Sequence, residues 1–174
     1  MFYEVDKAVF YLINNSMHVS ALDPVMVFVT RKPYVIFLIA LMVLAPRHRW
    51  GLVLPVILSL TAVGLSDLTG NFFKHLFERE RPFVVLDHVN KLISARSFAF
   101  PSNHAANAFA FATGIAWSFR KAAAPFLVIA FAVAFSRVYV GVHYPSDVIA
   151  GSVIGVASFF MVHFLYKRVR DLRT

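Results

Sequence analysis

The sequence consists of long apolar runs separated by short polar clusters, a pattern that few folds can accommodate. Five runs approach the length of about 20 residues that a membrane-crossing helix needs; they are Tyr34–Ala45, Gly51–Phe73, His104–Phe119, Ala122–Val140 and Val148–Tyr166. Apolar residues make up 59% of the 174 positions and charged residues 15%, whereas soluble domains have about 45–50% and about 25%. A water-soluble core of this size could not bury so much apolar surface. We therefore predict an all-α membrane protein, a polytopic bundle of about five transmembrane helices.

The N-terminal region adds two expectations to this bundle. The run Tyr34–Ala45 reaches membrane length only if it extends back through DPVMVFVT, with a kink at Pro33. Further upstream, apolar residues recur at helical spacing among charged ones, at Phe2, Val5, Val9 and Leu12. This spacing is typical of a helix that lies in the membrane interface, with a short sixth span as the alternative. Because no repeat or linker divides the chain and no basic leader opens it, we expect one domain, residues 1–174, without a cleaved signal peptide.

The basic residues indicate the orientation of the helices. With five spans, one side of the membrane receives eight cations: Arg47, Arg49, Arg120, Lys121, Lys167, Arg168, Arg170 and Arg173. The other side receives nine, several of them in polar clusters that have a chemical use of their own. The tail YKRVRDLRT has no such use and only one acid, so the positive-inside rule places this tail in the cytoplasm.

Three polar clusters fall at the same membrane level, on the opposite side from that tail. They are KHLFERERP (Lys74–Pro82), FPSNHA (Phe100–Ala105) and SRVYVGVHYPSDVIAG (Ser136–Gly151). An ionised side chain near the bilayer centre costs about 2.5–3.5 kcal/mol on insertion scales. Three clusters that converge at one depth therefore indicate a functional site.

The cations of these clusters suit a phosphate group. Lys74, Arg81 and Arg137 supply a point charge and two planar forks, and an arginine fork can bind two phosphate oxygens at once. Pro101 and Ser102 open a helix, so the backbone N–H groups of Ser102, Asn103 and His104 are expected to form an anion site at its N-terminus. Taken alone, each basic residue could equally anchor a helix to lipid head groups.

Two histidines and an aspartate add reactive groups beside these cations. His143 and Asp147 are four residues apart, so the carboxylate can hold the imidazole Nδ1–H and leave Nε2 free as a nucleophile or base. His104 can act as the proton donor to a leaving group. A cap formed by Asp147 and a helix-end role for His104 are the structural alternatives.

Taken together, the clusters resemble the three signature motifs of the type 2 phosphatidic acid phosphatase superfamily. The matching residues are Lys74-x6-Arg81-Pro82, Pro101-Ser102-Asn103-His104 and Ser136-Arg137-x5-His143-x3-Asp147. Small size makes the chain similar to compact bacterial members, such as undecaprenyl pyrophosphate phosphatases and lipid A 1-phosphatases. The family usually has glycine where Asn103 stands; asparagine also tolerates left-handed backbone.

The resemblance implies a role for each matching residue. His143 would attack phosphorus and form a phosphohistidine, Asp147 would orient His143, and His104 would protonate the leaving oxygen. The phosphate would be held by the remaining motif residues: Lys74, Arg81, Ser102, Asn103 and Arg137. Asp67 shares a helical face with Asn71 and Lys74, and we expect it either behind the site or in a packing hydrogen bond.

We therefore expect a metal-independent, cofactor-free phosphatase at the outer face of a bacterial cytoplasmic membrane, acting on a lipid of the bilayer. Lipid A 1-phosphate and undecaprenyl pyrophosphate are the leading substrates, followed by phosphatidylglycerol phosphate. The alternatives are a lipid phosphotransferase and a non-enzymatic anion-binding membrane protein or transporter. The net charge of +8 favours anionic partners, but the cations are too dispersed for nucleic acid. The pattern defines no oligomeric state.

Small residues make up the last pattern in the chain. Gly151-x3-Gly155 and the set Ala106, Ala110 and Gly114 form stripes on two of the predicted helices. Such stripes let helices pack closely in a membrane, so we assign them no chemistry.

Overall fold

The computed structural model describes residues 2–173, and every regular element in them is helical. The elements are α1 (Phe2–Tyr11), η1 (Leu12–Ser16), η2 (Ser20–Leu22), α2 (Asp23–Arg31), α3 (Pro33–His48), η3 (Arg49–Leu52), α4 (Val53–Phe77), α5 (Pro82–Val85), α6 (Asn103–Ser118), η4 (Arg120–Ala122), α7 (Ala123–Tyr139) and α8 (Pro145–Asp171). The predicted all-α class is therefore confirmed.

Within residues 2–173, three helical segments reach membrane-crossing length: Val53–Val85, Arg120–Tyr139 and Pro145–Asp171. A fourth candidate is the pair α2 and α3, which meet at an angle of 79°. The break falls at Lys32, directly before Pro33, because proline restricts the preceding residue and lacks the N–H that a continuous helix needs. The run Tyr34–Ala45 thus extends backwards with a kink at the predicted place.

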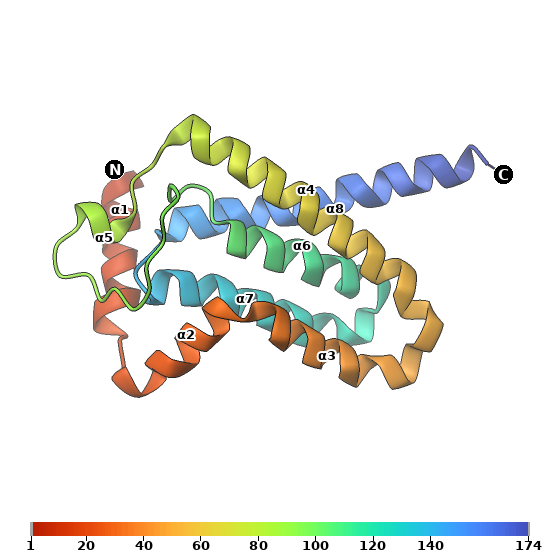
Figure 1. Ribbon diagram of the computed structural model, residues 1–174, viewed down its shortest axis with the longest axis horizontal. Coiled ribbons are helices and arrows are strands. Elements are labelled where there is room, and N and C mark those ends of the chain that lie inside the picture. The colour runs from red at the N-terminus through yellow and green to blue at the C-terminus, as the bar shows by residue number, and fades with distance from the viewer. Residues whose placement is uncertain (1, 174) are drawn as a thin grey trace.

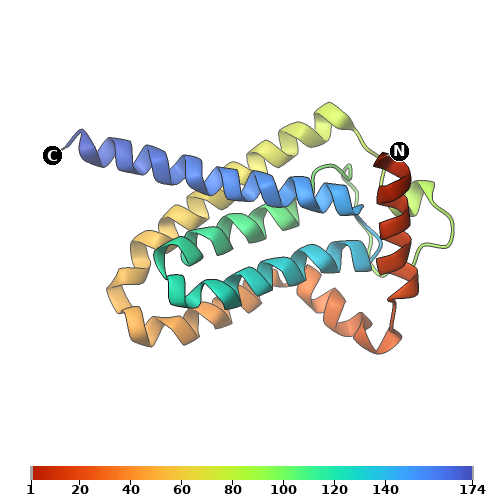
Figure 2. The same ribbon diagram turned by 180° about the vertical axis from the view of Figure 1, so that it is seen from behind.

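The remaining predicted span, His104–Phe119, corresponds to α6, which has 16 residues and lies inside the bundle rather than at its edge (Figures 1 and 2). It packs against α4, α7 and α8, and its small residues are buried, among them Ala105, Ala106, Ala110 and Ala112. A Cβ added at Gly155 would overlap the carbonyl oxygen of Ala106. The small-residue stripes therefore do what their spacing predicts and bring α6 and α8 into backbone contact.

Large apolar side chains cover the outside of this bundle. Val43, Leu68, Ile149 and Phe164 are among the exposed ones. So large an apolar exterior is typical of a surface that faces lipid rather than water. It supports the predicted multi-pass membrane fold.

Helix α1 lies across one end of the bundle, roughly perpendicular to α7 and α8 (Figures 1 and 2). The side chain of Asn14 fixes its C-terminal continuation, donating to the carbonyl oxygens of Tyr139 at 2.7 Å and Asn90 at 3.1 Å. With ten residues, α1 is not one of the span candidates in residues 2–173. The expected position at the membrane interface fits this geometry better than a sixth span.

Candidate active site

The three polar clusters meet at the end of the bundle that α1 covers. The end of α4, the start of α6, and the turn between α7 and α8 converge there (Figure 1). They surround a cavity of about 490 Å³, which six of the eight predicted site residues line: Lys74, Arg81, Asn103, His104, Arg137 and His143. Asp147 and Ser102 lie behind this lining, buried from solvent. The sequence motifs thus describe one site in space.

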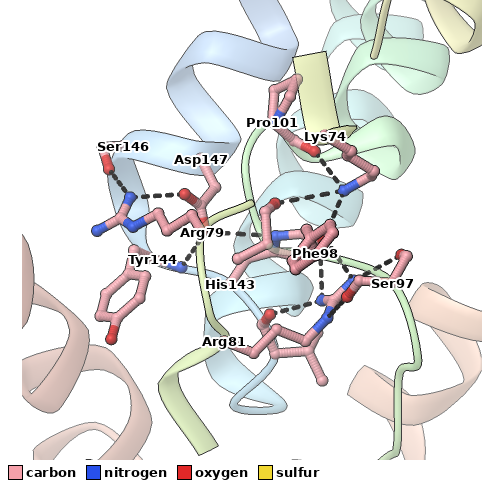
Figure 3. A network of polar contacts seen from close by, with 12 residues as sticks. Lys74, Arg79, Arg81, Ser97, Phe98, Pro101, His143, Tyr144, Ser146 and Asp147 are labelled. Atoms are coloured by element: carbon pink, nitrogen blue, oxygen red, sulfur yellow. Dashed lines mark hydrogen bonds and ion pairs between the residues drawn. The ribbon is translucent and has the colours of Figure 1, made fainter. Parts of the chain in front are cut away.

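His143 lies between the carboxylate of Asp147 and the guanidinium of Arg81, on the turn that leads into α8. Its Nδ1 lies 3.4 Å from Asp147 Oδ2, and its Nε2 lies 3.2 Å from Arg81 Nη1 (Figure 3). Because an arginine can only donate, this contact requires a lone pair on Nε2 and leaves the proton on Nδ1, toward the carboxylate. That tautomer has the nucleophilic nitrogen on the side of the cations.

The charge state of His143 fits the same role. Its side chain is fully buried, and burial is the main cause that lowers its pKa well below the ordinary 6.5. The positive charges of Arg137, Arg81 and Lys74 lower the pKa of His143 further. The imidazole is therefore neutral at neutral pH, as a nucleophile must be.

Two of the three motif cations hold the loop that leads from α5 to α6. Lys74 Nζ donates to the carbonyl oxygens of Phe98 and Pro101, each at 2.7 Å. Arg81 donates through Nε to the carbonyl oxygen of Ser97 at 2.6 Å and through Nη1 to that of Val142 at 2.7 Å. Both cations therefore shape the rim of the cavity as well as its electrostatic field.

Arg137 is the cation with donors to spare. Its Nη1 donates to Thr30 Oγ1 at 2.6 Å, whereas its Nε is buried without a hydrogen-bond partner. Within residues 2–173, no carboxylate lies within ion-pair distance of Lys74, Arg81 or Arg137. Burying three cations without a counter-ion is costly, so the cavity is built for an anion.

Ser102 and Asn103 differ from their predicted roles. The backbone N–H of Ser102 donates to the carbonyl oxygen of Asp147 at 2.9 Å, so it fastens α6 to α8 and is not free for a phosphate. Gly151 makes this possible, because a Cβ there would overlap the Ser102 carbonyl oxygen. The Asn103 amide donates to Asp67 Oδ1 at 3.0 Å and to Asn71 Oδ1 at 2.8 Å. The extra side chain at the usual glycine position thus ties α6 to α4.

His104 stands where two cavities meet. One is the polar cavity of the cations; the other measures about 580 Å³ and lies between α3, α4 and α6. The lining of the second cavity is mostly apolar and includes Phe37, Leu41 and Phe111. A proton donor at this junction would face the bond between a phosphate and an apolar leaving group.

Arg79 is a residue of the site that the sequence analysis did not single out. Its guanidinium donates to Asp147 Oδ1 at 2.6 Å and to Asp6 Oδ2 at 2.7 Å. The sequence held a signal for its partner Asp6, which precedes Phe10 by four residues, so that this acid shares a helical face with an aromatic residue.

Comparisons with known proteins give the site a context. A family model described as "PAP2 superfamily" matches residues 53–171. The undecaprenyl-diphosphatase BcrC of Bacillus subtilis is 32% identical over 180 residues, covering 99% of this chain and 86% of that protein. A protein of Bacillus licheniformis named bacitracin transport permease protein BcrC is 33% identical, covering 92% of this chain and 80% of its own. The crystal structure of Aquifex aeolicus LpxE superposes with a TM-score of 0.76 at 28% identity, covering 91% of this chain and 94% of that one.

Proposed function

Because the chain belongs to the PAP2 superfamily, we propose that it removes a phosphate group from a membrane lipid through a phosphohistidine on His143. The family confirms the predicted resemblance and the predicted class of enzyme, a lipid phosphatase. One observation supports the chemistry most strongly. A neutral, buried imidazole faces a cavity whose three cations have no carboxylate partner in the described residues.

In the first half of the reaction, Nε2 of His143 attacks phosphorus while the bond from phosphorus to the leaving oxygen breaks. The Arg81 Nη1 donor, which now lies 3.2 Å from Nε2, moves to a phosphate oxygen as the substrate enters. Arg137 has free donors for the same oxygens. The anionic phosphate offsets the cations around His104, so that His104 can bind the proton that it gives to the leaving oxygen. Asp147 stabilises the positive charge that develops on His143.

In the second half, water attacks the phosphohistidine. His104, now neutral, takes a proton from the water, and the phosphorus–nitrogen bond breaks toward His143. Inorganic phosphate and the proton on His104 leave, and both histidines return to their neutral forms. No step needs a metal, and no group of three His, Asp or Glu side chains in the described residues is placed to hold one.

The second cavity supports a lipid as the leaving group. Its apolar lining meets the phosphate cavity at His104, so a chain attached to the scissile oxygen would lie between α3, α4 and α6. Undecaprenyl diphosphate and lipid A 1-phosphate remain the leading candidates, with phosphatidylglycerol phosphate third. The name of the Bacillus subtilis relative favours the first of these.

We place the site at the outer face of the bacterial cytoplasmic membrane. The site lies at one end of the bundle, whereas η4 and the end of α8 lie at the other (Figure 1). The basic residues Arg120, Lys121, Lys167 and Arg168 belong to that second end. The positive-inside rule therefore supports a cytoplasmic C-terminus and an outward site.

A panel of purified lipid phosphates tests the proposal. We expect the protein in detergent to release inorganic phosphate from at least one lipid of the panel without an acceptor lipid. Release only after an acceptor lipid is added would identify a phosphotransferase. Binding without any turnover would favour the non-enzymatic alternative, an anion-binding membrane protein or transporter, which would need the cations but not both histidines. The name of the Bacillus licheniformis relative includes transport.

A further inference from the structure

A chain of three charges lies behind His143 and joins α1 to the site. Asp147 is fully buried and accepts from Arg79 Nη1 at 2.6 Å through Oδ1, while its Oδ2 faces His143 (Figure 3). The second arm of the guanidinium reaches Asp6 of α1 at 2.7 Å. The guanidinium thus joins Asp147, 68 positions after Arg79, to Asp6, 73 positions before it.

Further contacts fix both carboxylates of this row of three charges, those of Asp6 and Asp147. Asp6 is buried and accepts the Ser146 backbone N–H at 2.8 Å and the Ser146 hydroxyl. Asp147 Oδ2 also accepts the Tyr144 backbone N–H at 2.9 Å. The guanidinium lies over the Tyr144 ring, 4.0 Å from its centroid. Arg79 therefore has one well-defined position, and it does not line the phosphate cavity.

The net charge of Asp6, Arg79 and Asp147 suits the reaction. Asp6 and Asp147 contribute two negative charges and Arg79 one positive charge, so one negative charge remains beside His143. When His143 attacks phosphorus, its ring gains one positive charge, which that remaining charge balances in a buried site where charge interactions are strong. If Asp6 were absent, the positive charge of Arg79 would cancel the negative charge of Asp147.

We propose that Arg79 is a positioning residue that aims Asp147 at His143, and that Asp6 supplies the charge that keeps Asp147 effective. Helix α1 is then part of the catalytic apparatus and not only an anchor at the membrane interface. The inference rests on the proposed phosphohistidine chemistry, which it extends to Arg79, a variable position of the first motif, and to Asp6, outside all three motifs.

The charge balance separates this role from simple packing. Asp6→Asn leaves Asp147 neutralised by Arg79. Arg79→Gln leaves two carboxylates without the cation between them, which repel each other and release Asp147 from its position. The double variant Asp6→Asn/Arg79→Gln restores one negative charge. The proposal therefore predicts that the double variant is faster than Arg79→Gln alone, whereas a purely structural role predicts that it is at least as slow.

The experiment compares the parent with these three variants in detergent, using the lipid phosphate that the parent hydrolyses best. We expect each single variant to lower kcat by about ten- to a hundredfold, the usual worth of a hydrogen bond between charged groups, with KM nearly unchanged. The control is Glu4→Gln, an exposed acid on the same helix, which should keep the parent kcat. Arg79→Lys keeps the charge but not the two-armed contact, and it should fall between the parent and Arg79→Gln.

Several results would overturn the proposal. They are single variants with the kcat of the parent, a change confined to KM, or a double variant no faster than Arg79→Gln. If Arg79→Gln does not stay monodisperse, the same comparison of kcat and KM is made with Arg79→Lys, where a parent-like kcat overturns the proposal. A parent that releases no phosphate from any lipid would instead refute the proposed function.

Discussion

Replacing Gly155 by alanine should separate the two helices that carry the catalytic groups. A Cβ at this position would overlap the Ala106 carbonyl oxygen and lie 2.8 Å from the Ala110 nitrogen, both backbone atoms of α6. Backbone atoms of a buried helix cannot turn away as a side chain can. The methyl group must therefore push α8 and α6 apart.

The expected losses of stability and activity in Gly155→Ala follow from this geometry. Overpacking a well-packed core costs about 1–3 kcal/mol, so the thermal stability of the variant should fall. The same displacement moves His104, at the start of α6, relative to His143 and Asp147, at the start of α8. Because a misplacement of about 1 Å can cost on the order of a hundredfold in rate, we expect a large loss of kcat as well.

Gly64→Ala is the matched control, because a Cβ at Gly64 meets no atom within 4 Å. Alanine is better than glycine inside a helix by about 0.5–1 kcal/mol, so this variant should be as stable as the parent or more so, with unchanged kcat. Melting temperatures and phosphate release are measured for both variants in the same detergent. A Gly155→Ala protein as stable and as active as the parent would refute the close packing on which the site depends.

Three further predictions concern the metal, the membrane orientation and the charge of His143. Phosphate release should persist in excess chelator; complete loss that magnesium restores would refute the metal-independent mechanism. The chain has no native cysteine, so Asp87→Cys should react with an impermeant thiol reagent in intact spheroplasts and Leu172→Cys should not; the reverse pattern would place the site in the cytoplasm. Because the folded pKa of His143 is lowered, the unfolded chain binds a proton more readily below about pH 6.5, and stability is lost as the pH falls by up to about 1.4 kcal/mol per pH unit. The melting temperature of the parent should therefore fall relative to that of His143→Gln between pH 7.5 and pH 5.5, and a constant difference would contradict the buried, neutral imidazole.

The motif residues could be predicted from the sequence because their positions follow from helix ends. Lys74, His104 and Asp147 each stand beside the end of an apolar run, and runs of similar length bring their ends to one membrane level. The contact between His143 and Asp147 could be predicted from their spacing of four residues alone. Local pattern thus determined most of the site.

The remaining contacts depend on how the helices dock, which local pattern does not describe. Arg79 meets Asp6 only because α1 lies across the ends of α7 and α8. The Ser102 N–H is taken by Asp147 only because Gly151 lets the two backbones touch. Asn103 turns to Asp67 and Asn71 because α4 passes beside the start of α6. Each of these three contacts joins residues at least 32 positions apart.

The phosphohistidine is the central claim, and it can be measured directly. The protein is mixed with a lipid substrate labelled on its phosphate, quenched during turnover at alkaline pH, where phosphohistidine survives, and digested into peptides. We predict label on the peptide that contains His143, its loss on brief acid treatment, and neither label nor phosphate release in His143→Ala. Label on another residue, or a His143→Ala protein that releases phosphate at the rate of the parent, would contradict the account.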